Sequence, residues 1–243
     1  MSEKPISKSI VEDITATLRN EILRGQYRPG ERLPSERELA IRFEANRGAI
    51  RESLKKLEQL GIASINPGGV RVIPLEDASL SILGPLLDLH EEPDLELAIH
   101  LFEVLGSLMS MSARTAVERA NNEEIQELLT ISTNMIDAQK SDADNQENWK
   151  CIGSAFARLN NNLVLRLIFN GLRAQFLARS EQKPSFDHLV DQEKRMTILT
   201  QLHFGIESRN PTLVENAIND NFQLLIQTLE NQMPNSSRST INE

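Results

Sequence analysis

The chain is almost without cysteine. Cys151 is the single cysteine among 243 residues, so no disulfide can form within the chain. This composition is typical of a reducing compartment, and we expect a cytoplasmic protein. No obvious base neighbours the thiol, so we interpret Cys151 as a small core residue rather than a reactive one.

Long apolar runs are absent as well. No uninterrupted apolar stretch approaches the ~18 residues that a membrane-spanning helix needs. The N-terminal sequence MSEKPISKSIVEDI lacks the apolar core of a signal peptide. We therefore expect no membrane partner.

The motifs of common enzyme classes are also missing. The chain contains no G-x-S-x-G, no P-loop, no H-E-x-x-H and no glycine-rich strand–turn–helix. Its four histidines, His90, His100, His188 and His203, share no i, i+3 or i, i+4 spacing, so we interpret each as a surface or hydrogen-bonded structural residue. The sequence predicts that the protein is not an enzyme.

Charge is present in quantity, but it is unevenly distributed. The chain has 26 basic and 35 acidic residues, a net charge of −9. Residues 1–76 hold 13 of the basic and 11 of the acidic residues, which leaves +2 in this part and −11 in the remainder. A phosphate backbone would therefore be repelled by the second part and attracted by any basic face of the first.

Residues 34–61 predict two short helices joined by a tight turn. Ser35 followed by Glu38 forms a capping box at the first helix start. Asn46 is a candidate N-cap of the second helix, and Gly61 is suited to end it in the left-handed conformation. One apolar face of the second helix is formed by Ile50, Leu54 and Leu57.

The opposite face of that second helix is basic. Arg47, Arg51 and Lys55 recur at i, i+4 and i+8. Such a stripe is often only a solvated surface, but here it begins at the helix start, where helix-turn-helix proteins contact base edges. Residues 62–74, IASINPGGVRVIP, follow with the composition of a β-hairpin. Together these elements predict a winged helix-turn-helix.

The stretch YRPGERLPSERELAIRFEANRGAIRESLKKLEQLG resembles the GntR family of bacterial transcription regulators. It contains the P-G-x-x-L-P-S-E-R-E-L-A signature and an R-x-x-x-R-E-x-L recognition helix, and the resemblance covers about the first seventy residues. The resemblance implies a regulator that binds double-stranded operator DNA. By match to the family positions, with the flanking residues and the wing tip added, the expected DNA-binding set is Arg37, Asn46, Arg47, Gly48, Arg51, Lys55, Pro67, Gly68 and Gly69.

The remainder of the chain has helical periodicity throughout. The expected fold is therefore mostly α: an N-terminal winged helix-turn-helix with a small β-hairpin wing, and a C-terminal all-α bundle of six or seven helices. Its length and helical content resemble the FadR-type branch of the family. The predicted divisions are a DNA-binding domain at 1–74, a linker at 75–79, an effector-binding and dimerisation domain at 80–233, and a disordered tail at 234–243.

FadR-type effector domains often bind a divalent metal through one aspartate and three histidines. Alignment through Asn161-Asn162-Leu163 and residues 205–210 puts these ligand positions near Asn148, Ile152, Leu199 and Asn221. The usual arginine and glutamate of the first long helix fall near Leu105 and Met109. Two amides and two aliphatic side chains cannot replace a carboxylate and three imidazoles as ligands of a transition-metal ion.

We therefore expect no metal and no cofactor. A bundle interior with these residues favours a small-molecule effector that is partly apolar, such as an acyl-CoA, over a small polar acid. The leading interpretation is a homodimeric, ligand-responsive transcription regulator. Two alternatives remain open: a regulator whose bundle only dimerises, and a metal-dependent helical enzyme domain fused to a DNA-binding domain.

Overall fold

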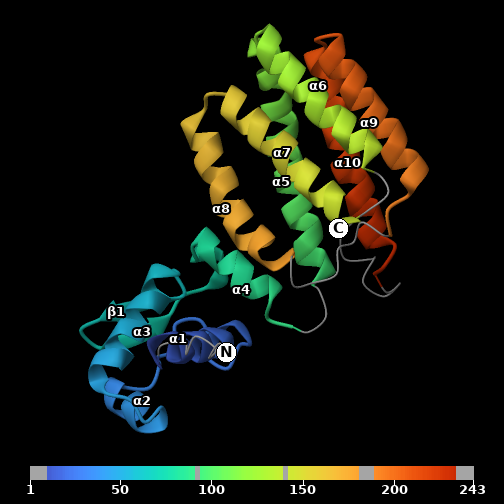
Figure 1. Ribbon diagram of the computed structural model, residues 1–243. Coiled ribbons are helices and arrows are strands. Elements are labelled where there is room, and N and C mark those ends of the chain that lie inside the picture. The colour runs from blue at the N-terminus through green and yellow to red at the C-terminus, as the bar shows by residue number, and fades with distance from the viewer. Residues whose placement is uncertain (1–9, 91–93, 139–141, 181–188, 234–243) are drawn as a thin grey trace, which may run out of the picture. The chain divides into compact units, whose positions relative to one another are not determined.

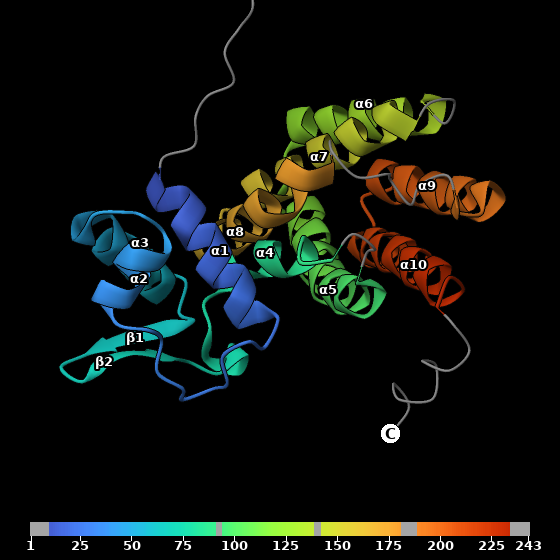
Figure 2. The same cartoon turned by 90° about the horizontal axis from the view of Figure 1, so that it is seen from below.

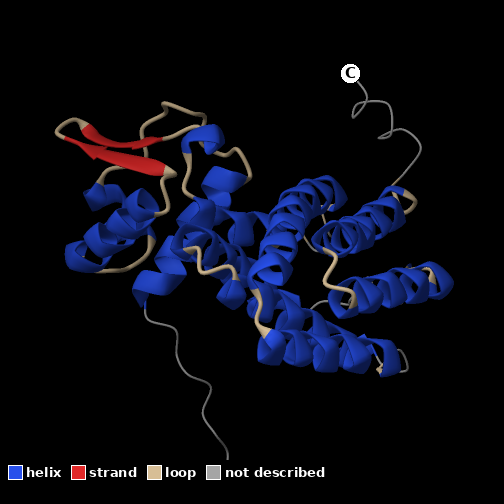
Figure 3. Cartoon of the chain, turned by 90° about the horizontal axis from the view of Figure 1, so that it is seen from above, coloured by secondary structure: helices blue, strands red, loops and turns tan. Residues whose placement is uncertain are grey.

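A computed structural model describes residues 10–90, 94–138, 142–180 and 189–233 (Figure 1). The chain forms two compact units, which divide between Glu92 and Pro93. The first contains the strands and the short helices, and the second is helical throughout its described part (Figure 3). The tail predicted to be disordered, residues 234–243, lies outside the described residues.

Three helices and a hairpin form most of the first unit. The helices are α1 (Ile10–Leu23), α2 (Glu36–Arg42) and α3 (Arg47–Gln59). The apolar faces predicted from helical spacing meet in one core, whose members include Ile14, Leu18, Leu39, Ile50, Leu54 and Leu57. Ser53, buried on α3, donates to the carbonyl of Val11 at 3.1 Å and so joins α3 to α1.

The hairpin follows α3 directly. Strands β1 (Ala63–Asn66) and β2 (Gly69–Val72) are antiparallel and pair from Ala63 with Val72 to Asn66 with Gly69. Pro67 and Gly68 are therefore the two turn residues, and Gly69 already belongs to β2. The chain ahead of α2 runs along the other edge of β2, because Leu33 N–H donates to the Val70 carbonyl at 2.9 Å. These elements are the predicted winged helix-turn-helix.

The segment after the hairpin also belongs to the first unit. It forms the 3₁₀ turns Leu75–Asp77 and Leu80–Ile82 and the short helix α4 (Leu83–Leu87). Ile82 is buried in the core of this unit, and Ser79 donates to the Leu60 carbonyl at 3.0 Å. The residues expected to be a linker are thus in contact with the DNA-binding domain, and the compact units divide later than the boundary we predicted.

Two local predictions from composition are wrong in this segment and the next. A Gly-Pro pair at 84–85 predicts an interrupted helix, but it lies within the first turn of α4, where proline costs no hydrogen bond. The polar composition of residues 141–148 predicts a loop, yet helix begins at Asp142. This polar segment contains neither glycine nor proline, so nothing in it prevents helix formation.

Six long helices form the described part of the second unit. They are α5 (Leu95–Arg119), α6 (Asn122–Asp137), α7 (Asp142–Leu159), α8 (Leu163–Ser180), α9 (Gln192–Glu207) and α10 (Pro211–Glu230). Side-chain oxygens cap several of them: Asn121 with Glu124 forms a capping box on α6, and Asn210 precedes Pro211 on α10.

Five of these helices surround a common core. α5 contacts α10, α10 contacts α9, α9 contacts α6, α6 contacts α7, and α7 returns to α5 (Figure 2). α8 packs against α7 outside this ring. α5 and α10 are closely apposed: the rings of Phe102 and Phe222 meet edge to face at 6.2 Å, and a Cβ at Gly106 would lie 2.9 Å from Cγ of Phe222.

Helix α5 is apolar because it is central to this unit. By length and composition it is the one described helix that could cross a membrane. Eleven of its residues are buried within the unit, among them Phe102, Met109 and Ala113. The core helix of a bundle passes the same length-and-hydropathy test, and the burial of α5 accounts for its composition.

Candidate nucleic-acid interface and the bundle interior

Local hydrogen bonds set the starts of both helices of the helix-turn-helix. Ser35 and Glu38 form the predicted capping box on α2. The hydrogen bonds from the hydroxyl and the backbone N–H of Ser35 hold the pKa of Glu38 below its usual value. On α3, the Asn46 side chain accepts from Ala49 N–H at 2.9 Å. The capping residues therefore hold α3 at the register in which Arg47 begins it.

Gly48 has a structural role that the sequence did not indicate. A Cβ at this position would lie 3.1 Å from Oδ1 of Asn46. The missing side chain thus leaves room for the Asn46 cap. From the sequence, Gly48 was predicted only as a member of the DNA-binding set, and that role stays a prediction.

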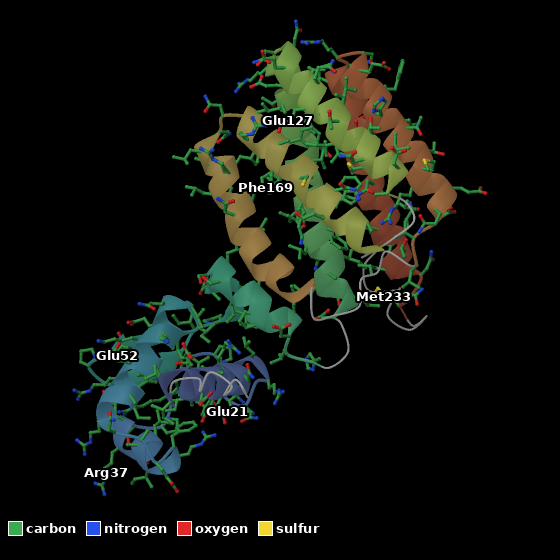
Figure 4. The ribbon with its side chains drawn as sticks, in the orientation of Figure 1. Glu21, Arg37, Glu52, Glu127, Phe169 and Met233 are labelled. Carbon is green, nitrogen blue, oxygen red and sulfur yellow. The ribbon has the colours of Figure 1, made fainter. Side chains whose placement is uncertain are left out.

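The predicted basic stripe is on the surface of the first unit. Arg47, Arg51 and Lys55 are all exposed on α3, and Arg37 projects outward from α2 (Figure 4). Two of these cations are paired with carboxylates. Nε of Arg51 lies 2.8 Å from a carboxylate oxygen of Glu36, and Nζ of Lys55 lies 2.9 Å from Glu52.

The two glutamates were missed by sequence reasoning. Glu52 could have been found, because it precedes Lys55 by three residues on the same helix. Glu36 could not, because it lies on α2, fifteen residues before Arg51, and only the turn between the helices brings the two together. The surface therefore presents the guanidinium groups of Arg37, Arg47 and Arg51, and the Arg51 group is paired with Glu36.

A cation that the sequence did not predict, Arg32, lies beside the wing. Pro67 and Gly68 are exposed at the turn, as expected of a wing tip. Gly69 has φ +115° and lies beneath the Arg32 side chain, because a Cβ here would be 2.8 Å from Cζ of Arg32. The tertiary fold thus puts a guanidinium beside the wing, although Pro67 itself cannot donate a hydrogen bond.

A second arginine fixes the base of the wing. Arg71 on β2 donates from Nη1 to the Gly30 carbonyl at 2.8 Å. Arg42 of α2 pairs with Glu21 of α1, and this hydrogen bond raises the pKa of Arg42. These bonds join the wing to the chain ahead of α2 and α2 to α1, and Ser53 joins α3 to α1.

Comparison with known proteins agrees with this geometry. Residues 10–72 match the model of the bacterial regulatory proteins of the gntR family. Residues 10–72 are a GntR-family helix-turn-helix domain, and the relatives of the chain are GntR-type transcription regulators. It is 29% identical to HTH-type transcriptional regulator Mce2R of Mycobacterium tuberculosis over 179 residues, covering 72% of this chain and 74% of that protein. These relatives are regulators and not enzymes, as the missing catalytic motifs predicted.

Other relatives extend the likeness into the second unit. The fatty acid metabolism regulator protein of Pectobacterium atrosepticum is 31% identical over 158 residues, which cover 64% of each chain. This likeness agrees with the FadR-type resemblance. The fold is shared with the solved structure of Lar, which controls expression of the Listeria monocytogenes agr system, at a TM-score of 0.58, 14% identity and coverage of 96% of this chain and 100% of that one.

The predicted effector positions in the second unit are brought together only in part. Met109 of α5, Ile152 of α7 and Leu199 of α9 belong to one apolar cluster and are at most 8% exposed. Asn221 of α10 is also buried. Leu105 packs in a neighbouring cluster, and Asn148 is half-buried with Nδ2 3.4 Å from the Asn134 carbonyl.

The described interior of the second unit has few side chains that could bind a metal ion. Among the described residues there is no group of three or more His, Cys, Asp or Glu side chains that could hold an ion. The residues at the family's ligand positions do not fit a metal, because apolar Ile152 and Leu199 replace two of its ligands. That the protein binds no metal stays a prediction.

Two single residues of the bundle were also interpreted from the sequence. His203 was interpreted as structural, and its Nδ1 lies 2.9 Å from Oγ of Ser132 across the α6–α9 contact. Cys151 was interpreted as a core residue, and this was wrong: it is exposed on α7, while its neighbour Ile152 is fully buried. The helix period turns adjacent residues to different sides, so one apolar neighbour says little about the next.

Proposed function

We propose that this protein reads its operator with Arg37, Arg47 and Arg51, and that the wing around Pro67, Gly68 and Gly69 contacts the adjacent groove. The observation behind this proposal is the exposed arginine pair on a capped α3. An arginine can donate two hydrogen bonds to the O6 and N7 atoms of a guanine. Asn46, Gly48 and Lys55 complete the proposed surface.

We also propose that the second unit binds a partly apolar effector within its helical ring. Support comes from Met109, Ile152 and Leu199, which converge from three helices on one apolar interior. With apolar side chains at two of the family's metal-ligand positions, no metal ion is expected to hold a small acid there. The name of the Pectobacterium relative, a fatty acid metabolism regulator, favours a ligand with an acyl chain, such as an acyl-CoA.

The alternative of a bundle that only dimerises has an observation in its favour. A Cβ at Gly153 would lie 3.2 Å from Cε of Met109, so α5 and α7 are closely packed beside Ile152. A ligand would have to displace the Met109 side chain, which is flexible enough to move. A thermal-shift screen that includes fatty acyl-CoAs separates these cases, because a ligand specific for the native state raises the unfolding temperature.

The second unit has a surface suited to a homodimer. Leu163, Val164 and Leu167 are 60–67% exposed, and Ile168 is 38% exposed, all on the same face of α8. Leu165 and Leu172 on the opposite face are buried. A standard interface buries about 800 Å² per partner, and its fully buried centre is apolar. Four exposed aliphatic side chains on one helix can supply such a centre.

A second copy of this chain is the occupant we propose for the α8 face. Each chain has one recognition helix, and helix-turn-helix proteins read two half-sites as symmetric dimers. A two-fold axis beside α8 would pair the face with itself, so no other partner is needed. The proposed assembly is a cytoplasmic homodimer on double-stranded operator DNA.

The test of the DNA-binding surface begins with an operator selected by the full-length protein from a random duplex pool. Arg47→Ala and Arg51→Ala should each weaken operator binding by about 1–3 kcal/mol at a fixed salt concentration. Lys56→Ala is the matched control, because Lys56 is exposed on α3 but lies about half a turn around the helix from Arg47. If both arginine variants bind like the wild type, the assigned orientation of α3 is wrong.

A further inference from the structure

The ion pair between Glu36 and Arg51 joins the two helices of the helix-turn-helix. Nε of Arg51 lies 3.0 Å from Oε1 and 2.8 Å from Oε2 of Glu36. Glu36 is in the first turn of α2, and Arg51 is one turn into α3. The carboxylate therefore reaches across the turn to the middle of the basic stripe.

This pair does little for the stability of the fold. The side chains of Arg51 and Glu36 are 62% and 37% exposed. At such exposure water and salt screen the attraction, and ordering two long side chains opposes it. The consequence of the pair is geometric: it restricts a side chain with four rotatable bonds to one orientation.

Glu36 contacts Arg51 at Nε and leaves the Nη1 and Nη2 groups of Arg51 available to bind a base. Both hydrogen bonds with Glu36 use Nε, at the side of the guanidinium. Among the described residues, no hydrogen bond links Nη1 or Nη2 to the protein. These two groups form the end of the planar fork that can donate to the O6 and N7 atoms of a guanine.

We propose that Glu36 is a positioning residue for operator specificity. Its carboxylate holds Nε of Arg51 so that Nη1 and Nη2 face a base edge before DNA arrives. The guanidinium then loses less conformational freedom on binding the correct base. This inference rests on the proposed reading role of Arg51. The opposite arrangement, in which Glu36 competes with DNA for Arg51, predicts a gain in operator preference when Glu36 is removed.

Glu52 supplies a matched control on the same surface. It is an exposed glutamate of α3 that pairs with Lys55, so Glu52→Ala and Glu36→Ala remove one negative charge each. Removing an acid beside DNA strengthens binding to every sequence through the phosphates. Only a residue that orients a base-reading group changes the ratio of non-specific to operator dissociation constants.

The experiment measures that ratio by fluorescence anisotropy at several salt concentrations, using the selected operator and a duplex with its guanines replaced. Glu36→Ala should lower the ratio by about tenfold, since a bidentate arginine contact discriminates by about that factor. Glu36→Gln keeps an acceptor for Nε without the charge, so its ratio should lie between those of Glu36→Ala and the wild type. Glu52→Ala should leave the ratio unchanged.

A double-mutant comparison tests whether Glu36 acts through Arg51. In an Arg51→Ala background, Glu36→Ala should change the ratio no further. Circular dichroism melting of each variant reports whether α2 and α3 remain folded. Equal ratios for Glu36→Ala and Glu52→Ala would overturn the inference, as would an effect that persists without Arg51 or a gain in operator preference. If the wild-type protein bound the operator and the guanine-replaced duplex equally well, the proposed DNA-reading surface would be overturned as well.

Discussion

Asn46 and Gly48 together determine where the recognition helix begins. The Asn46 carboxamide satisfies the free N–H of Ala49, and the absence of a Cβ at Gly48 leaves space for it. The cap sets the register of α3, and the register decides which side chains reach the exposed face. A local hydrogen bond therefore determines the direction of Arg47, the first residue of α3.

Replacement of Asn46 by alanine should destabilise the first unit by about 0.5–2 kcal/mol, because an N-cap acceptor is lost. Urea unfolding followed by Tyr27 fluorescence measures this change, since Tyr27 is the single tyrosine and packs on this unit. Trp149 packs on the second unit and should report no change. Asn46→Ser keeps an acceptor oxygen and should recover most of the loss. An unchanged midpoint for Asn46→Ala would show that the cap contributes little.

The Ser35–Glu38 capping box predicts a dependence on pH. The hydrogen bonds from Ser35 lower the pKa of Glu38 in the folded state. A carboxyl group with a lowered pKa contributes stability above its unfolded pKa, and that contribution disappears as the pH falls through the folded value. The first unit should therefore lose stability on acidification, and Ser35→Ala should reduce this dependence. Urea midpoints measured across the acid range in both proteins test it, and parallel curves would contradict it.

At the scale of elements, the wing is a hairpin that depends on a side chain from outside itself. Arg32 precedes α2 in the sequence, yet its guanidinium lies against Gly69 of β2. The main chain around Arg32 also bonds to β2, since Val72 N–H donates to the Glu31 carbonyl at 2.9 Å. The wing therefore has a third strand-like neighbour, which gives it both a position and a positive charge.

Gly69→Ala should weaken operator binding, because φ +115° is strained for alanine and the new Cβ would displace Arg32. Gly68→Ala is the control, since no atom lies within 4 Å of a Cβ built there. Gly68→Glu should again weaken binding, because a negative charge at the turn would approach the phosphates. Anisotropy titrations of the three variants on one operator compare them. Equal affinity for Gly68→Glu and Gly68→Ala would count against contact by the wing.

At the scale of the whole molecule, the α8 face is the proposed contact between two copies of the chain. Its outer side chains are exposed, while Phe169 on the inner side packs on the bundle core (Figure 4). Burial of the outer face in a dimer would remove apolar surface from water, at about 25 cal/mol for each Å². A second copy of the chain would also bring a second recognition helix to the operator.

The double variant Val164→Glu/Leu167→Glu should dissociate the proposed dimer, because two carboxylates would be buried without partners. Sedimentation velocity over a range of protein concentrations should show at least a ~100-fold weaker association. Phe204→Glu on α9 is the control, since Phe204 is 57% exposed but lies on another helix. A dimer that survives the double change would place the interface elsewhere.

Elemental analysis should find less than about a tenth of an equivalent of zinc, nickel or manganese in protein purified without chelator and without affinity-tag metal. The physical reason is the replacement of two ligand positions by Ile152 and Leu199, which can bind no ion. About one ion per chain, with loss of effector response on chelation, would overturn the expectation and revive the metal-dependent alternative.

What the sequence by itself determined about this protein is local in origin. The caps at Ser35, Asn46 and Asn121 depend on residues three positions apart, and helical spacing determines the apolar faces. Short-range geometry of this kind can be predicted from the order of residues, and it sufficed for the helix-turn-helix, the wing and the helical second unit. It failed at residues 141–148, where polar composition did not distinguish a loop from the start of a helix.

Only the tertiary structure decided the contacts between residues distant in sequence. Glu36 meets Arg51 because the turn between α2 and α3 sets their crossing, and Arg32 meets Gly69 because the chain ahead of α2 lies along β2. In the second unit, the ring of five helices decides that Met109, Ile152 and Leu199 share one interior. Such contacts depend on how whole elements pack, a property that no local pattern of residue types specifies.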